Sequence, residues 1–372
     1  PEAVSVISEA AGQLTVNWEK VDGAAGYKLQ YSTSEAFTED TTKTIAITDG
    51  NIISKILTEL TKGTIYYARV AVCINVDDVE YSGVYSAPES AKVKSTFSVK
   101  TIATQTYSGS YKKPSLTVTD GSEVLELNRD YEVSYSNNKY IGTAKVTITG
   151  IGDYAGTVTE SFKIIAPKGN TYTVSSIKYK ITNADIDGTG TVSVVGASSK
   201  SITSLTINST VTIGNCKYKI TSIGEKAFKD YTKLKTVSIG SNVTTIYSSG
   251  FNGCSALTTV KGCTEVTKIS NYAFYNCKKL TRVGGYTGKV TLPAVKTIGS
   301  NAFRNCVAVT YVNLSSKQLT SIGESAFRGC TRLKTVAGAT TVTTINTSAF
   351  NGCSALTTVK GCTKVTKIGN YA

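Results

Sequence analysis

The chain has 372 residues, of which 40 are basic and 26 are acidic, so its formal net charge is +14. It contains no histidine, which excludes Ser-His-Asp and Cys-His triads and every zinc site that needs a histidine ligand. Hydrophobic residues make up 40% of the sequence, which argues against disorder, and no apolar run approaches the roughly 18 residues of a membrane helix.

The charge is distributed unevenly along the sequence. Residues 1–94 carry a net charge of −5 (8 basic, 13 acidic), residues 95–167 are neutral (7 of each), and residues 168–372 carry +19 (25 basic, 6 acidic). The sequence pattern changes at the same positions. We therefore predict a mainly β multidomain protein with three domains at these boundaries.

Residues 1–94 show the alternation of a β-sandwich. Residues 14–18 and 65–72 have β-branched and aromatic side chains at every second position, which is typical of strands. The pattern Leu-Thr-Lys-Gly-Thr-Ile-Tyr at residues 60–66, downstream of the single tryptophan, resembles a fibronectin type III domain; another Ig-like sandwich is the alternative. The resemblance implies that Trp18 fills the core between the sheets and that the Tyr66 hydroxyl pins the corner before the next strand.

Residues 95–167 also predict strands. Tyr-x-Gly at 107–109 is followed by Asp-Tyr-x-Val-x-Tyr at 130–135, Gly-Thr-Ala at 142–144 and Gly-x-Tyr-x-Gly-Thr-Val at 152–158. This order resembles the small MBG-like or Ig-like β module that is repeated along bacterial cell-surface proteins. The resemblance implies a spacer in a stalk, and ligand binding by this module is the less favoured alternative.

A repeat fills the last segment. Phenylalanine recurs at intervals of 23, 23, 29, 24 and 23 residues, and Ile, Cys, Leu and Val recur in phase with it. The phenylalanines are Phe228, Phe251, Phe274, Phe303, Phe327 and Phe350. A fixed period in this range predicts a solenoid, in which stacked coils bury one continuous core. The long interval contains six extra residues near 284–288.

The unit Ile-Gly-x-x-Ala-Phe-x-x-Cys-x-x-Leu-x-x-Val, present at residues 322–336, resembles the BspA-like subfamily of leucine-rich repeats on bacterial surfaces. The match covers residues 223–372, and residues 168–222 resemble the strand-rich N-terminal cap of such arrays. A cap is needed because the first coil would otherwise expose its core. The chain reaches Ala372 where the next phenylalanine is due, so we expect a truncated or uncapped end. Since it starts at Pro1 and lacks methionine, we expect it to belong to a longer translation product.

Eight of the nine cysteines lie in residues 168–372, and five share one repeat position: Cys254, Cys277, Cys306, Cys330 and Cys353. We predict a column of small buried side chains, because the odd count and the packing phase disfavour a disulfide framework. The redox state stays open, since an external location favours oxidation. A metal site is disfavoured without a CxxC pair, and no cofactor is predicted.

Residues 183–188, Asn-Ala-Asp-Ile-Asp-Gly, mimic the start of a calcium loop. Val194 stands where the closing carboxylate of such a loop belongs. We therefore predict an ordinary β-turn at this position.

No catalytic constellation is evident, so we predict that the protein is not an enzyme. If the Leu-x-x-Val stretch is a strand, alternation turns Leu and Val inward and exposes their neighbours on a shallow concave face. The exposed row is Thr236, Thr259, Lys261, Arg282, Tyr311, Asn313, Thr335, Thr358 and Lys360. Its candidate ligand-binding residues are Lys261, Arg282, Tyr311, Asn313 and Lys360. The alternative is that these are merely solvated strand positions.

The sequence thus predicts a non-enzymatic bacterial protein, extracellular and either secreted or attached to the cell surface, that uses its basic leucine-rich-repeat face for adhesion or recognition. Expected partners are host or bacterial surface proteins, or anionic glycans and envelope polymers. Specific nucleic-acid binding is not expected, because there is no recognised binding motif and no aromatic–basic cluster. The alternatives are a passive structural stalk and an accessory module of a larger extracellular enzyme.

Overall fold

The computed structural model describes residues 1–184, 189–284 and 289–372. Within these ranges the regular structure is almost entirely β-strand, with one short 3-10 helix, η1 (Cys263–Glu265). This confirms the predicted mainly β fold class. Residues 185–188 of the calcium-like turn, and residues 285–288 of the long repeat interval, lie outside the described ranges.

The chain forms two compact units. One contains residues 1–105, 110–139 and 143–164, and the other contains residues 106–109, 140–142 and 165–372. The division of the first unit at residue 94 stays a prediction.

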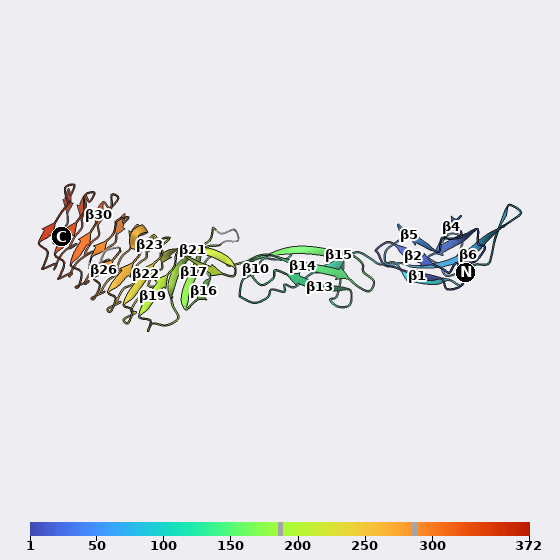
Figure 1. Ribbon diagram of the computed structural model, residues 1–372, viewed down its shortest axis with the longest axis horizontal. Coiled ribbons are helices and arrows are strands. Elements are labelled where there is room, and N and C mark those ends of the chain that lie inside the picture. The colour runs from blue at the N-terminus through green and yellow to red at the C-terminus, as the bar shows by residue number, and fades with distance from the viewer. Residues whose placement is uncertain (185–188, 285–288) are drawn as a thin grey trace. The chain divides into compact units, whose positions relative to one another are not determined.

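The first part of the chain is a β-sandwich of two antiparallel sheets (Figure 1). The sheets have the orders β1-β2-β5 and β4-β3-β6-β7, with β8 also paired to β6. The strands are β1 (Ser5–Ile7), β2 (Leu14–Asn17), β3 (Gly26–Ser32), β4 (Thr42–Ile47), β5 (Ser54–Leu57), β6 (Ile65–Val76), β7 (Val79–Ser82) and β8 (Glu89–Lys92).

The sandwich core contains the residues predicted from the sequence. Trp18 is 3% exposed, and its ring packs edge-on against Tyr27 with 5.4 Å between the centroids. The Tyr66 hydroxyl accepts a hydrogen bond of 3.3 Å from the Thr61 N–H, across the corner that leads into β6. Both predicted roles, of the tryptophan in the core and of the tyrosine at the corner, are confirmed.

Two small sheets follow, with the orders β10-β15-β14-β13 and β12-β11-β9. The strands are β9 (Ser98–Val99), β10 (Gln105–Thr106), β11 (Val118–Asp120), β12 (Glu123–Val124), β13 (Tyr131–Ser136), β14 (Gly142–Gly150) and β15 (Thr157–Ile165). Alternate residues of β14, such as Val146 and Ile148, are fully buried, as expected for a strand with one face on a core. The resemblance to an MBG-like spacer stays a prediction.

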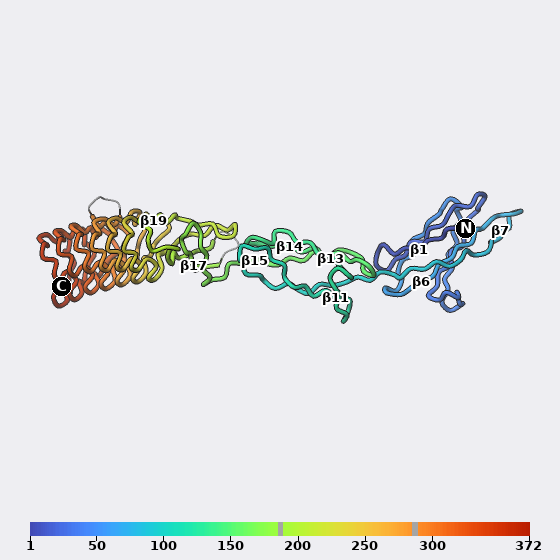
Figure 2. The backbone as a smooth tube through the Cα atoms, turned by 90° about the horizontal axis from the view of Figure 1, so that it is seen from below, coloured from blue at the N-terminus to red at the C-terminus, as the bar shows by residue number. Residues whose placement is uncertain are grey.

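Residues 165–372 form a solenoid in which two sheets enclose one continuous core, and Figures 1 and 2 show its coils stacked side by side. One sheet has eleven strands in the described residues, ordered β16-β17-β18-β21-β23-β25-β28-β30-β32-β34 with β20 paired to β21. The other has eight, ordered β19-β22-β24-β26-β27-β29-β31-β33.

The strands of the eleven-stranded sheet are β16 (Thr171–Val174), β17 (Ile177–Asn183), β18 (Thr191–Ala197), β20 (Thr210–Ile213), β21 (Cys216–Ile223), β23 (Thr245–Ile246), β25 (Lys268–Ile269), β28 (Thr297–Ile298), β30 (Ser321–Ile322), β32 (Thr344–Ile345) and β34 (Lys367–Ile368). Those of the eight-stranded sheet are β19 (Ser204–Ile207), β22 (Thr236–Ile239), β24 (Thr259–Lys261), β26 (Arg282–Val283), β27 (Val290–Thr291), β29 (Tyr311–Asn313), β31 (Thr335–Ala337) and β33 (Thr358–Val359).

Each repeat places one short strand in each sheet, and the phenylalanine lies in the turns between them. Leu257 and Val260 of one coil are both fully buried, as the repeat phase predicted. The strand is shorter than expected, because β24 begins only at Thr259. Residues three apart point to opposite faces of a continuous strand, so Leu257 has to lie in the turn before it.

The long repeat interval adds a strand to one sheet only. β26 and β27 pair side by side in the eight-stranded sheet, whereas β25 pairs directly with β28 in the other sheet. The rings of Phe274 and Phe303 are 5.1 Å apart, so the coils remain in stacking contact on the phenylalanine side. The added strand β27 therefore lengthens the eight-stranded side alone by one strand spacing, about 4.8 Å.

Candidate functional site

The core of the solenoid holds the coils in fixed register. Successive phenylalanine rings from Phe228 to Phe350 stack with centroids 5.1–5.5 Å apart and planes within 14° of parallel. Beside them, each repeat cysteine donates its thiol proton to the carbonyl of the phenylalanine one coil earlier. The Sγ···O distances are 3.0 Å from Cys254, 3.1 Å from Cys277, Cys306 and Cys353, and 3.2 Å from Cys330.

The cysteine column is buried, as predicted. Cys254, Cys277, Cys306 and Cys330 are fully buried, and Cys353, in the last coil, is partly so. All nine cysteines lie in described residues, and none of them forms a disulfide there. Burial disfavours the thiolate and raises the pKa of Cys254 to about 12 and that of Cys353 to about 11. These thiols are packing and hydrogen-bonding groups and not nucleophiles.

One side of the coils carries positive charge without any carboxylate. We call it the acid-free face: residues 231–238, 254–261, 277–284, 289–291, 306–313, 330–337 and 353–360, which run from the cysteine column through the eight-stranded sheet. It contains ten cationic residues, namely Lys233, Lys235, Lys261, Lys278, Lys279, Arg282, Lys289, Arg332, Lys334 and Lys360. The carboxylates of the described repeats lie outside these ranges: Glu225, Asp230 and Glu324 are in other turns, and Glu265 is in η1.

The five residues predicted to bind a ligand all lie on this face, in two columns. Arg282 and Tyr311 continue the column of Thr259, which is in register with Arg282. The second column, two residues further along the chain in each coil, contains Lys261, Asn313 and Lys360. The Lys360 N–H donates a hydrogen bond of 2.8 Å to the Val336 carbonyl of the preceding coil. Lys261 and Lys360 are exposed, and the other three are half-buried. Their role in binding stays a prediction.

The structure changes the spacing within one column. The sequence pattern makes Arg282 and Tyr311 neighbours, but β27 lies between their strands. Lys289, which precedes β27, places its Nζ 4.7 Å from the centre of the Tyr311 ring. This cation–π contact makes Lys289 the direct neighbour of Tyr311, and Arg282 instead donates from Nε to the Gly284 carbonyl at 3.3 Å.

A basic notch lies at the edge of the acid-free face. It has a volume of about 380 Å³ and is lined by Lys278, Lys279, Val307, Ala308, Thr331 and Arg332. The middle coil contributes only short apolar side chains, so the three cations of the flanking coils border an open space. Sequence reasoning missed this notch, although a cation precedes the repeat leucine at Lys233, Lys279 and Arg332.

The family of the repeats is shown by direct comparison. The model for the BspA type leucine-rich repeat region matches residues 197–284 and 286–372, in six copies. The C-terminal region of this chain is a BspA-type leucine-rich repeat array. No curated protein matches the chain.

Several solved structures are similar to parts of the chain. A leucine-rich cell surface protein from Faecalibacterium prausnitzii is 28% identical, with a TM-score of 0.44, over 55% of this chain and 51% of that one. A leucine-rich repeat protein from Bacteroides ovatus is 25% identical, with a TM-score of 0.40, over 54% and 56%. A two-domain fibronectin type III segment of chicken tenascin is 14% identical, with a TM-score of 0.23, over 44% and 98%. The chain thus spans about half the length of the first two proteins.

The BspA-type array presents an elongated and rigid cationic surface. Lys261 and Lys360 are five strand positions apart in the sheet order, a distance of about 24 Å at the usual strand spacing. The inner strands of this sheet cannot move independently, because each is hydrogen-bonded to a strand on both sides. Such a surface can contact several negative groups along one polymer or one protein face. Within the described residues, no helix has the length and apolar character needed to cross a membrane.

Proposed function

We propose that this is a non-enzymatic bacterial protein, secreted or displayed on the cell surface, whose BspA-type array binds anionic polymers or acidic protein surfaces through the acid-free face. The observation that carries the proposal is one side of the coils that, in the described residues, carries cations and no carboxylate. Ten cationic residues share one side, and the described repeats place their carboxylates elsewhere.

The electrostatics favour an extended partner. Neighbouring strands bring cations within about one Debye length of each other, about 10 Å at 0.1 M salt, so their fields add. The notch of Lys278, Lys279 and Arg332 provides a concave point at which one phosphate, sulfate or carboxylate can meet three cations. Arg332 offers paired N–H donors to such a group, and the two lysines offer point charges.

Charge-reversal variants of the full chain test this proposal. Heparin and purified teichoic acid are immobilised, and binding is measured at about 0.05 M and 0.3 M salt, where screening differs strongly. The notch variant carries Lys278→Glu, Lys279→Glu and Arg332→Glu. The matched control reverses three exposed lysines at the eleven-stranded sheet, Lys268, Lys296 and Lys367, and has the same net charge.

We expect the notch variant to bind at least about tenfold more weakly at low salt, equivalent to 1.4 kcal/mol, and the control to lose less than about threefold. Equal losses would show that net charge alone drives binding and would contradict a specific face. If neither heparin nor teichoic acid binds saturably, the result would favour a passive stalk.

A further inference from the structure

The eight-stranded sheet ends at β19, which pairs only with β22 among the described residues. The Thr236 N–H donates to the Thr203 carbonyl, and Ser204 stands opposite Thr236 in the register. In a parallel ladder with this register, the backbone N–H and C=O groups of Thr203 and of every second residue after it point toward β22. The backbone N–H and C=O groups of Ser204 and Thr206 point to the unpaired side of β19.

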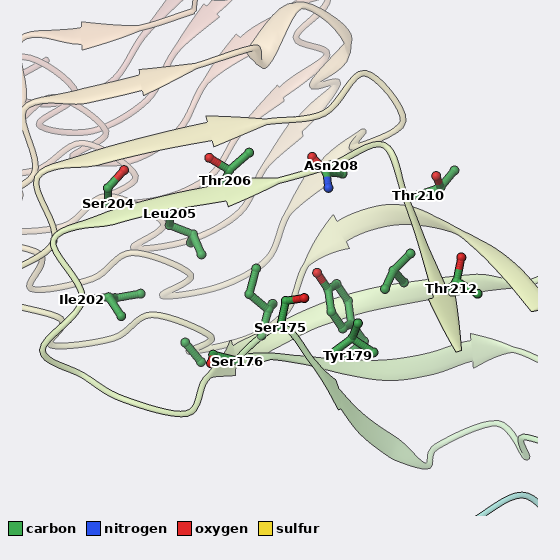
Figure 3. A pocket seen from close by; sticks show the side chains of 14 residues that line it. Ser175, Ser176, Tyr179, Ile202, Ser204, Leu205, Thr206, Asn208, Thr210 and Thr212 are labelled. Carbon is green, nitrogen blue, oxygen red and sulfur yellow. The ribbon is translucent and has the colours of Figure 1, made fainter. Parts of the chain in front are cut away.

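A groove of about 480 Å³ runs along this unpaired side. Figure 3 shows Leu205 of β19 directed into it from one side and Ser175, Ser176 and Tyr179 of the β16–β17 hairpin on the other. Val211 of β20 also lines the groove. Tyr179 is 5% exposed, and its hydroxyl points into the space without a hydrogen-bond partner in the described part of the chain.

The lining of the groove is uncharged, although residues 168–372 carry a net charge of +19. It consists of serine, threonine and asparagine side chains above an apolar floor. Polyanions therefore have no counter-charge here. The unpaired groups of β19 require donors and acceptors at the spacing of a strand, about 3.3 Å per residue, and an extended polypeptide supplies them in that spacing.

We propose that this groove binds an extended, uncharged polypeptide segment, which adds a strand to the eight-stranded sheet beside β19. The backbone of the segment pairs with Ser204 and Thr206. Every second side chain of the segment faces Tyr179 and Val211 and covers the apolar floor, and the uncharged lining selects against acidic or basic residues at these positions. The residues that line the groove lie outside the acid-free face, so the two sites use different side chains.

The probe is the peptide acetyl-Thr-Val-Ser-Ile-Gly-amide, which has the sequence of residues 236–240 and so of the strand that pairs with the other side of β19. Two further versions are N-methylated at its first and third, or at its second and fourth, residues. In a two-edged strand only alternate N–H groups face a given neighbour. We expect one methylated version to bind at least about tenfold more weakly and the other to bind within about threefold of the parent. Amide exchange at Ser204 and Thr206 should slow when the parent peptide binds.

Two variants of the full chain complete the test. Thr206→Pro removes an N–H that the β22 ladder does not use, so the sheet should persist while strand addition is blocked. Thr206→Val keeps the N–H and is the matched control. We expect at least about a tenfold loss of peptide binding for the first and less than about twofold for the second, with heparin binding unchanged in both.

The proposal is overturned if the peptide does not bind, if both methylated versions bind equally, or if maltohexaose binds saturably in place of the peptide. The last result would show recognition of hydroxyl groups by the lining side chains. The methylated peptides keep the test decisive if Thr206→Pro does not fold, and the heparin measurement separates failure here from failure of the proposed polyanion site.

Discussion

Replacing Phe303 by alanine should be among the most destabilising single changes in the array. Phe303 is fully buried, and its ring lies 5.1 Å from that of Phe274 and 5.3 Å from that of Phe327, nearly parallel to both. Core Phe→Ala changes cost about 3–5 kcal/mol, and aromatic pairs contribute about 0.5–1.5 kcal/mol each beyond area burial. With two ring partners lost, we expect a loss near the top of that range, about 5 kcal/mol.

The matched control is Phe350→Ala, at the same repeat position in the last complete coil. Phe350 is only partly buried and stacks in the described residues on Phe327 alone, at 5.5 Å. The same truncation there removes one ring contact and leaves a smaller cavity. We therefore expect a loss of about 2 kcal/mol, less than half of that at Phe303.

Urea unfolding of the full chain measures both values, with far-UV circular dichroism reporting all strands. The single tryptophan, Trp18, lies in the core of the N-terminal sandwich, so its fluorescence marks that transition separately and should not shift in either variant. Equal destabilisation by the two substitutions, or a loss below about 1 kcal/mol at Phe303, would refute the stacked core as the source of stability.

Gly262→Ala should lower the stability more than Gly361→Ala, although the two coils have nearly identical sequences. Both glycines have positive φ, a conformation that costs alanine about 1 kcal/mol at either position. However, a Cβ at Gly262 would lie 1.9 Å from a backbone carbonyl oxygen, whereas one at Gly361 would come no closer than 3.2 Å to any atom. Urea unfolding compares them, and equal losses would argue against that contact. Tyr66→Phe should lower the stability of the sandwich by about 1 kcal/mol, measured by tryptophan fluorescence, because the corner hydrogen bond is lost. Burial raises the pKa of Cys254 and of Cys263 from 9.0 to about 12, so the stability that their neutral thiols contribute is complete below pH 9 and decreases as the pH rises toward 12. Thiolate absorbance should therefore appear near pH 9 in the urea-unfolded chain and at higher pH in the native chain; coincident titrations would contradict the buried column.

The repeat phase was sufficient to predict the core, since each apolar position recurs in every coil and has one environment. Phe303 and Cys306 were predicted to be buried because their equivalents in other coils obey the same pattern. The strand β27 could not be predicted, because six extra residues fit a surface loop as well as an added strand. Periodicity identifies equivalent positions and does not determine how an exception to the repeat is accommodated.

The two binding sites depend on differences between coils and not on the repeat. The notch exists because Val307 and Ala308 are short where Lys278, Lys279 and Arg332 are long, and this contrast appears only when the coils are stacked. The groove at β19 exists because one sheet stops while the other continues through β18, β17 and β16. A sequence pattern reports what the coils share, so it gives no direct signal for either feature.

The acid-free face and the uniform core are physically connected. Ten cationic residues on one side repel one another, and the described repeats offer no carboxylate on that side to offset the repulsion. The stacked rings, thiol hydrogen bonds and continuous strand ladders must stabilise the array against this repulsion. Salt screens the repulsion between coils and also the attraction of a polyanion. Added salt therefore stabilises the free array while weakening its polyanion complexes, and this opposition distinguishes an unneutralised cationic face from one whose charges are already paired.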